Sequence, residues 1–301
     1  PDPPSPPFGD QINVENLVIA HYLDAPPLAL DDKALRARRD AFFAKLPEFY
    51  GGLDFKGIRL PEAIERTAGL KLADVYVPVR VRPDAPDART RQRLAGRLWG
   101  GEDADADDPD EHPEPLDLAT LIRTSPALVL LGDPGAGKTT LLKFLALELA
   151  RSPGGVVPIL IPLAAYSRWL EHAPQRSLTD FLADYYESRI THIGNLGALF
   201  RVALQQGRAV VLLDGLDEVV SDRGYIVERV DAFVRDFLPP VGEIRETPGN
   251  RVIVTSRFVG YQEAPLSDAR WQTLALVDWE LGDDDTPGEI ETFVTRFTWA
   301  V

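Results

Sequence analysis

The residues best suited to hold a phosphate form one short glycine-rich run that fits the pattern G-x-x-x-x-G-K-[ST] in full. Glycines let the backbone curl so that successive N–H groups face one anion, and the start of a helix adds its positive end. The candidate nucleotide-binding residues of this phosphate loop are Gly132, Asp133, Pro134, Gly135, Ala136, Gly137, Lys138, Thr139 and Thr140. We expect them to surround the phosphates of a nucleotide.

Two side chains at the end of this run have distinct expected roles. The ammonium of Lys138 would bridge the β- and γ-phosphates, and the hydroxyl of Thr139 would bind Mg²⁺. An apolar strand pattern at 127–131 precedes the run and a helical pattern follows it, which is the context that the motif requires. The alternative, a glycine-rich turn that binds nothing, is weaker in this context.

A second candidate is the sequence VVLLDGLDE at 210–218, where a buried strand ends in an acid. Its first acid, Asp214, would lie at the carboxyl end of the strand, where α/β folds place their ligands. We expect Asp214 to bind Mg²⁺ directly or through a water. Strands also end in Asp because turns follow them, but the phosphate loop upstream favours the metal role.

The acids Asp217 and Glu218 follow at the edge of the same expected site. Either carboxylate could orient or activate an attacking water, and we place Glu218 ahead of Asp217. Both could instead lie in the first turn of a helix, where acids favour the helix dipole. The sequence leaves this choice open.

The third candidate is Arg257, which follows the apolar strand pattern of 251–255. If that strand lies beside the phosphate-loop strand, Arg257 would point at the γ-phosphate. One charge-assisted contact would then distinguish a triphosphate from a diphosphate. A lone Arg after a strand is more often a solvated surface residue, so this role depends on the other two motifs.

The elements that must position these residues alternate between short apolar strands and helical segments, which is typical of a parallel sheet covered by helices. We predict strands near 127–131, 156–161, 209–213, 251–255 and 272–276. We predict helices near 138–150, 178–190, 196–206, 225–238 and 287–299. The fold class is therefore α/β.

The N-terminal part of the chain has a different pattern. Apolar residues recur at helix spacing and predict one helix, with a second over Ile58–Ala68. The apolar residues of the first helix are Leu35, Phe42, Phe43, Leu46 and Phe49. The expected organisation is a tail at 1–10, a helical region at 11–100 with an extended arm at 72–81, an acidic flexible linker at 101–120, a nucleotide-binding domain at 121–285 and the start of a helical domain at 286–301.

Composition narrows the classes of function. The formal net charge of −15 argues against a nucleic-acid clamp, although nine of the acids lie within 101–117. The chain has no Cys, which excludes disulfides and thiolate chemistry and fits a cytoplasmic protein. No apolar run approaches the ~20 residues of a membrane helix, so we expect no membrane partner. The chain begins at Pro1 and has no Met, so we expect an excerpt of a longer polypeptide.

Together, GDPGAGKTT, VVLLDGLDE and VIVTSR resemble the NACHT branch of the STAND signalling P-loop NTPases over roughly residues 125–300. The arm LADVYVPVRV also resembles the lead-in of bacterial NACHT proteins, which implies that Val77 and Pro78 touch the base. The resemblance implies a five-stranded sheet of order 5-1-4-3-2, with ATP or ADP and Mg²⁺ as ligands. It further implies a slowly hydrolysing switch in signalling or antiphage defence that self-associates when ATP is bound, between effector and sensor domains of the same polypeptide.

Two departures from the family pattern stand out. Phe258 occupies the place where a Pro commonly follows the sensor Arg. The winged-helix domain of the family, with its nucleotide-contacting His, is not in this sequence, so we expect weaker ATP binding than in an intact protein.

Other functions fit less well. A GTPase would need an N-K-x-D element and an ABC transporter subunit an L-S-G-G-Q signature, and the sequence has neither. Two alternatives stay open: a nucleotide-dependent scaffold with negligible hydrolysis, and a P-loop kinase.

Overall fold

The protein is represented by a computed structural model that describes residues 33–52, 72, 76, 80–83, 122, 125–151, 156–190, 192–239 and 249–276. Several predictions fall outside these residues and stay predictions. They concern the tail at 1–10, the helix Ile58–Ala68, the linker at 101–120, the helix at 287–299, the segment 286–301, and the base contacts of Val77 and Pro78.

A six-stranded sheet forms the centre of the fold, in the order β1-β6-β2-β5-β4-β3. Its strands are β1 (Val81–Pro83), β2 (Ala127–Leu131), β3 (Val157–Pro162), β4 (Ala209–Asp214), β5 (Arg251–Ser256) and β6 (Trp271–Leu276). The five strands from β2 onward are parallel, and their order is the predicted 5-1-4-3-2. The predicted α/β P-loop architecture is confirmed.

The predicted number of five strands is wrong by one. Residues Val81–Pro83 pair antiparallel with β6, with Val81 opposite Leu276. Without this strand, β6 would present an unpaired row of N–H and C=O groups at the edge of the sheet. The end of the predicted arm therefore lies in the sheet itself.

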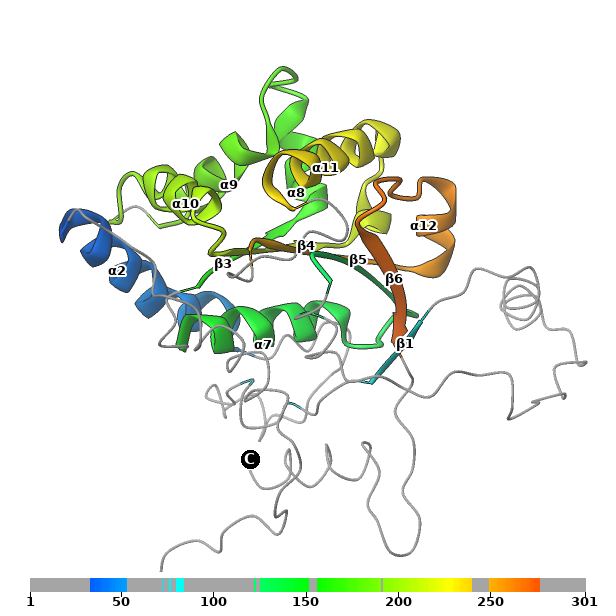
Figure 1. The fold of residues 1–301 in the computed structure, drawn as a ribbon, viewed down its shortest axis with the longest axis horizontal. Coiled ribbons are helices and arrows are strands. Elements are labelled where there is room, and N and C mark those ends of the chain that lie inside the picture. Colours follow the sequence, from blue (N-terminus) through cyan, green and yellow to red (C-terminus); the bar gives the residue numbers. More distant parts are fainter. Residues whose placement is uncertain are drawn as a thin grey trace, which may run out of the picture.

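Helices cover both faces of the sheet (Figure 1). They are α2 (Lys33–Tyr50), α7 (Lys138–Arg151), α8 (Leu163–Leu170), α9 (Leu178–Glu187), α10 (Leu196–Gln205), the short 3-10 turn η2 (Leu216–Glu218), α11 (Arg223–Phe237) and α12 (Phe258–Glu263). In Figure 1, α7 and α2 lie below the sheet, and α8, α9 and α11 lie above it. The predictions missed α8 and α12. The first is only eight residues long and follows β3 directly, and the second is only six residues long and buries none of them fully, so each is too short for a clear helical period.

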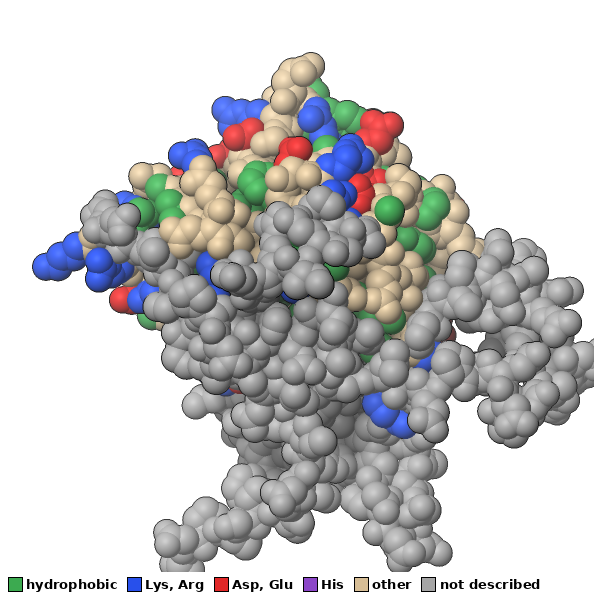
Figure 2. Space-filling view, in the orientation of Figure 1, with side chains coloured by type: hydrophobic (Ala, Val, Ile, Leu, Met, Phe, Trp, Pro, Cys, Tyr) green, Lys and Arg blue, Asp and Glu red, His purple; other side chains and the backbone are tan. Residues whose placement is uncertain are grey.

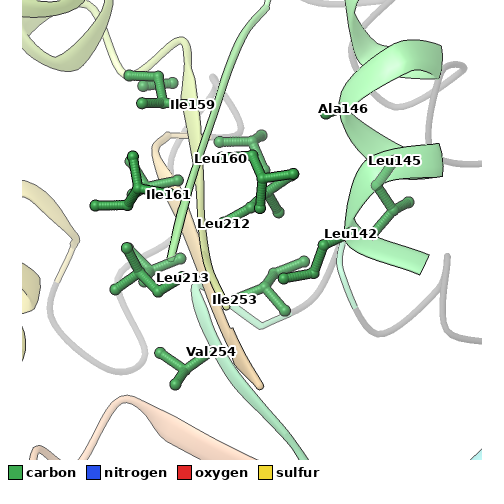
Figure 3. Close-up of a cluster of buried hydrophobic side chains, with 14 of the residues drawn as sticks. Leu142, Leu145, Ala146, Ile159, Leu160, Ile161, Leu212, Leu213, Ile253 and Val254 are labelled. Carbon is green, nitrogen blue, oxygen red and sulfur yellow. The ribbon is translucent and has the colours of Figure 1, made fainter. Parts of the chain in front are cut away.

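The core lies between the sheet and these two helical layers. Every residue of β2 and of β5 is buried, as expected for strands that are covered on both faces. Figure 3 shows the alternation: Leu160, Leu212 and Ile253 point toward Leu142, Leu145 and Ala146 of α7, whereas Ile159, Ile161, Leu213 and Val254 point to the other face. This packing holds β2, β5 and β4 side by side. It therefore also positions the residues at the ends of these strands.

Helix α2 packs beside α7 and reaches the β3 edge of the sheet. It buries Phe42 and Leu46 of the predicted apolar positions, together with Tyr50, whereas Phe49 is 37% exposed. The ring of Phe42 meets that of Tyr186 edge-on at 5.1 Å between centroids. A helix from the N-terminal region is therefore part of the same core.

Two tyrosine hydroxyls bind the backbone of Leu160 at the edge strand β3. The Tyr186 hydroxyl accepts a hydrogen bond from the backbone N–H of Leu160 (2.9 Å) and donates to the Leu160 carbonyl (2.8 Å). The Tyr50 hydroxyl lies 3.0 Å from that carbonyl and 2.8 Å from the Tyr186 hydroxyl. Burial raises the pKa of both tyrosines above the ordinary value. Both rings therefore stay neutral and can make these hydrogen bonds.

The surface in Figure 2 carries Lys and Arg interspersed with Asp and Glu over the upper helices. Within the described ranges, no helix combines the length and the apolar character that crossing a bilayer requires.

Candidate functional site

The three sequence motifs meet at one edge of the sheet. The phosphate loop follows β2, Asp214 ends β4, and Arg257 follows β5. Strand β5 lies between β2 and β4, and all three run parallel. Their carboxyl ends therefore open onto the same place, which is where open α/β sheets bind ligands.

The phosphate loop has the backbone shape that its glycines permit. Gly135 and Gly137 have φ angles of 88° and 79°, in the left-handed region that favours glycine. Gly132 is constrained differently, because a Cβ there would lie 3.2 Å from the Cβ of Ala136 and 3.3 Å from that of Leu276. Helix α7 begins at Lys138, so its N-terminal end faces the loop.

The side chain of Lys138 folds back across the phosphate loop. Its Nζ donates to the carbonyl oxygens of Gly132 (2.6 Å) and Asp133 (2.9 Å). Partial burial lowers the pKa of Lys138, the charges of Asp217, Asp133 and Asp214 oppose that shift, and Arg257 adds to it. The ammonium is therefore held in the loop in a place where an anion would stabilise its charge.

Thr139 and Asp214 are in direct contact. The Thr139 hydroxyl donates to Oδ2 of Asp214 at 2.8 Å, and the Thr255 hydroxyl donates to Oδ1 at 2.7 Å. Thr255 also accepts the backbone N–H of Gly215 at 2.9 Å. The carboxylate of Asp214 is thus fixed from both sides, with one side facing the phosphate loop.

This donor set suits magnesium. Mg²⁺ prefers oxygen ligands and is commonly held by one or two carboxylates together with substrate phosphates and waters. Thr139 and Asp214 supply one hydroxyl and one carboxylate beside the phosphate loop. In the described part of the chain, no cluster of three or more His, Cys, Asp or Glu could hold a metal by itself. Thr139 and Asp214 are therefore two oxygen donors that fit Mg²⁺.

Asp217 and Arg257 form a pair beside the loop. Oδ1 of Asp217 accepts the backbone N–H of Arg257 (3.0 Å), and Oδ2 lies 3.1 Å from the Arg257 Nε. The Asp217 side chain is only 10% exposed, whereas that of Arg257 is 53% exposed. Glu218 is exposed and lies against Gly215, whose added Cβ would be 3.0 Å from the Glu218 carboxyl carbon. Asp217 is therefore paired with Arg257, and Glu218 is the more exposed of the two acids.

A comparison with protein-family models matches residues 127–275 to the NACHT domain. This chain carries a NACHT domain. The predicted recognition is confirmed, and the domain is a nucleotide-binding P-loop NTPase module.

Among solved structures, the chain is similar to C. elegans PCH-2, with 15% identity and a TM-score of 0.28 over 64% of this chain and 44% of that one. It is also similar to a chain of the E. coli MS115-1 HORMA:CdnC:Trip13 complex, with 15% identity and a TM-score of 0.26 over 71% and 73% of the two chains. The chain thus spans less than half of the PCH-2 chain. No curated protein matches it.

Two residues of the NACHT domain touch the site without belonging to the predicted set. Thr255 lies within the apolar run VIVTS, and its hydroxyl in a buried strand was the available signal. Arg223 begins α11 and donates to the carbonyl oxygen of Asp217 at 3.1 Å, a contact that no spacing in the sequence indicates.

The NACHT domain also has a hollow of about 550 Å³ between α8 and α9. Trp169, Phe181, Tyr185 and Arg189 are among its lining residues, and the Arg189 guanidinium lies 3.8 Å from the centroid of the Tyr185 ring. None of the candidate nucleotide-binding residues lines it. The hollow is therefore separate from the phosphate loop.

Proposed function

We propose that this NACHT domain binds Mg-ATP, hydrolyses it slowly, and acts as the switch of a signalling or defence protein. The observation that carries the proposal is the hydrogen bond between Thr139 and Asp214. It brings the end of the phosphate loop and the acid of β4 to the distance at which both can share one metal ion.

Each element of the site has a role in this proposal. The loop amides from Gly132 onward and the ammonium of Lys138 bind the phosphates, and Thr139 and Asp214 bind Mg²⁺. The ion would neutralise charge on the phosphate oxygens. Val77 and Pro78 remain the proposed contacts of the adenine base.

Glu218 is the proposed base that orients or activates the attacking water. The Asp217 carboxylate lies 3.1 Å from the Arg257 Nε, so we assign Asp217 to holding Arg257. Because Asp217 has this second role, we assign the water to Glu218. The Arg257 side chain would leave Asp217 to contact the γ-phosphate and would return to Asp217 after hydrolysis. The ion pair between Arg257 and Asp217 would then belong to the ADP-bound state of the switch.

The binding step is tested by measuring Mg-ATP affinity calorimetrically for the parent chain and for Lys138→Ala. Charge-assisted hydrogen bonds contribute about 1.5–3 kcal/mol, so we expect affinity to fall at least about tenfold. Lys143→Ala is the matched control, because Lys143 lies on the same helix, five positions farther along the chain. Equal affinity for the parent and Lys138→Ala would reject the proposed site.

The hydrolysis step is tested by phosphate release. We expect slow turnover in the parent, none in Glu218→Gln, and Mg-ATP binding in both. Absence of turnover in the parent would favour the scaffold alternative. Transfer of phosphate to an added small acceptor, in place of water, would favour the kinase alternative.

The proposed setting is a cytoplasmic protein in which effector and sensor domains of the same polypeptide flank the switch, and which binds no nucleic acid through this segment. NACHT domains often oligomerise. We therefore expect the sedimentation coefficient to rise with Mg-ATP and to stay low with ADP.

A further inference from the structure

Arg223 lies outside every motif of the nucleotide site, yet its guanidinium joins two of the site's elements. Its Nη2 donates to the carbonyl oxygens of Asp217 and Val219, both at 3.1 Å. Its Nη1 donates to the carbonyl oxygen of Gly260 at 3.1 Å and to the Glu263 carboxylate. The side chain is only 19% exposed. One side chain thus binds four acceptors.

These acceptors belong to the two parts of the proposed switch. Asp217 and Val219 lie in and just after η2, the turn that carries both candidate acids. Gly260 and Glu263 lie in α12, which begins immediately after Arg257. A guanidinium can reach both because its five N–H donors form a rigid planar fork, whereas a lysine has all its donors on one nitrogen.

The same two elements touch through their backbones. A Cβ on Gly260 would lie 2.4 Å from the Cβ and 3.0 Å from the Cα of Asp217. Separations under 3.0 Å essentially never occur for real Cβ atoms, so only glycine fits without a shift. In addition, the Asp217 carboxylate accepts the N–H of Arg257, the residue at the start of α12. The turn and α12 are therefore joined by a close approach and a hydrogen bond as well as by Arg223.

We infer that Arg223 is a positioning residue that joins the acid-bearing turn to α12 and so couples the γ-phosphate contact of Arg257 to the placement of Asp217 and Glu218. This inference rests on the proposed function. Without Arg223, the loop could still bind the α- and β-phosphates, but Arg257 would be less well placed to distinguish ATP from ADP. Loss of Arg223 should therefore affect discrimination more than binding.

The test compares Mg-ATP and Mg-ADP affinities, and kcat and KM for ATP, for the parent, Arg223→Ala and Arg223→Lys. Coupling between linked sites is typically about 5- to 150-fold, so we expect the preference for ATP over ADP to fall about fivefold or more in both variants. We expect ADP affinity to stay within about twofold of the parent and kcat to fall more than KM rises.

Two controls separate coupling from general stability. Arg229→Ala removes another guanidinium of α11, which donates to the carbonyl oxygen of Pro174 at 2.8 Å, away from the turn. It should keep the parent's preference. Gly260→Ala disturbs the same contact between η2 and α12 from the side of α12. It should lower the preference for ATP over ADP as Arg223→Ala does.

Either Arg223 variant overturns the inference if it folds, binds ADP and keeps the parent's ATP preference and kcat. If Arg223→Ala does not fold, Arg223→Lys and Gly260→Ala decide by the same measure. A parent chain that binds neither nucleotide rejects the proposed function, and that outcome is distinct from normal discrimination in the variants.

Discussion

Lys138 carries a charge that its burial in the phosphate loop disfavours. Its ammonium is bonded to two backbone carbonyls, and burial lowers its pKa below the ordinary lysine value. A bound polyphosphate would bring several negative charges to the same place and raise that pKa again. Nucleotide binding and protonation of Lys138 should therefore be linked.

This linkage gives a prediction about pH. Between the lowered pKa of the free protein and the higher pKa of the complex, the complex holds more protons. Binding of Mg-ATP at alkaline pH should thus take up protons, and affinity should fall as pH rises through this window. Calorimetry in two buffers with different ionisation enthalpies measures the uptake. Lys143→Ala should show the same uptake as the parent, and a parent without uptake would contradict the assigned position of the charge.

Thr255 gives a second prediction at this scale. Thr255→Val keeps the shape of the side chain but leaves the Gly215 N–H and Oδ1 of Asp214 without this partner. An unsatisfied buried group costs about 1–3 kcal/mol, so we expect the free energy of unfolding in urea to fall by about that amount. We also expect weaker dependence of ATP binding on Mg²⁺.

Thr273→Val is the matched control. Thr273 is also a threonine within a strand, but it lies in β6, away from Asp214. It should change the free energy of unfolding by less than Thr255→Val does. Equal losses in the two variants would show that the hydroxyl of Thr255 has no special role beside Asp214.

At the residue scale, the sequence predicts those features of the site that depend on residues close together in the chain. The phosphate loop and Asp214 can be identified because each is a local pattern that follows an apolar strand. The contacts of Arg223 and Thr255 could not be predicted, because they cross between α11 and α12 or between β5 and β4, although the hydroxyl of Thr255 in an apolar run was a signal of a polar role. The Asp217–Arg257 pair likewise joins residues that are 40 positions apart.

At the scale of elements, side chains bind one residue of the sheet's β3 edge. Strand β3 ends the sheet, and the hydroxyls of Tyr186 and Tyr50 bind the N–H and C=O of Leu160. An unpaired edge strand is a template for pairing with another chain. These tyrosines therefore both attach α2 and occupy part of that edge.

The two tyrosines should differ in their effect on stability. Tyr186→Phe leaves the buried Leu160 N–H without its partner, so we expect a loss of about 1–3 kcal/mol in the free energy of unfolding. Tyr50→Phe removes only a hydroxyl shared with the Tyr186 side chain and the Leu160 carbonyl, and should cost less. Urea unfolding followed by circular dichroism measures both, and the reverse ranking would contradict this account of the edge.

The parallel strands and the longer helices could be predicted because apolar runs and helical spacing are strong over five residues or more. The predicted ranges 138–150 and 196–206 lie within one residue of α7 and α10 at each end. Strand β1 could not be predicted as part of the sheet, because three residues carry no period of their own. Its structure depends on the partner strand β6.

At the scale of the whole molecule, a ligand that binds only the folded chain should stabilise it by mass action. At a Mg-ATP concentration about 100 times Kd, the gain is about 2.7 kcal/mol. For a domain of this size, each kcal/mol raises Tm by about 2–4 °C, so we expect a rise of about 5–10 °C. Thermal unfolding with Mg-ATP, with ATP and EDTA, and with Lys138→Ala tests this, and equal shifts in all three samples would contradict it.

The short strand β1 links distant parts of the chain. Val81 pairs with Leu276, and Leu276 lies against Gly132, where the phosphate loop begins. Two residue contacts thus connect the N-terminal part of the chain to the start of the phosphate loop. We therefore expect that separating Val81 from Leu276 would change the packing beside Gly132, so that the N-terminal pairing of the sheet bears on the shape of the phosphate loop.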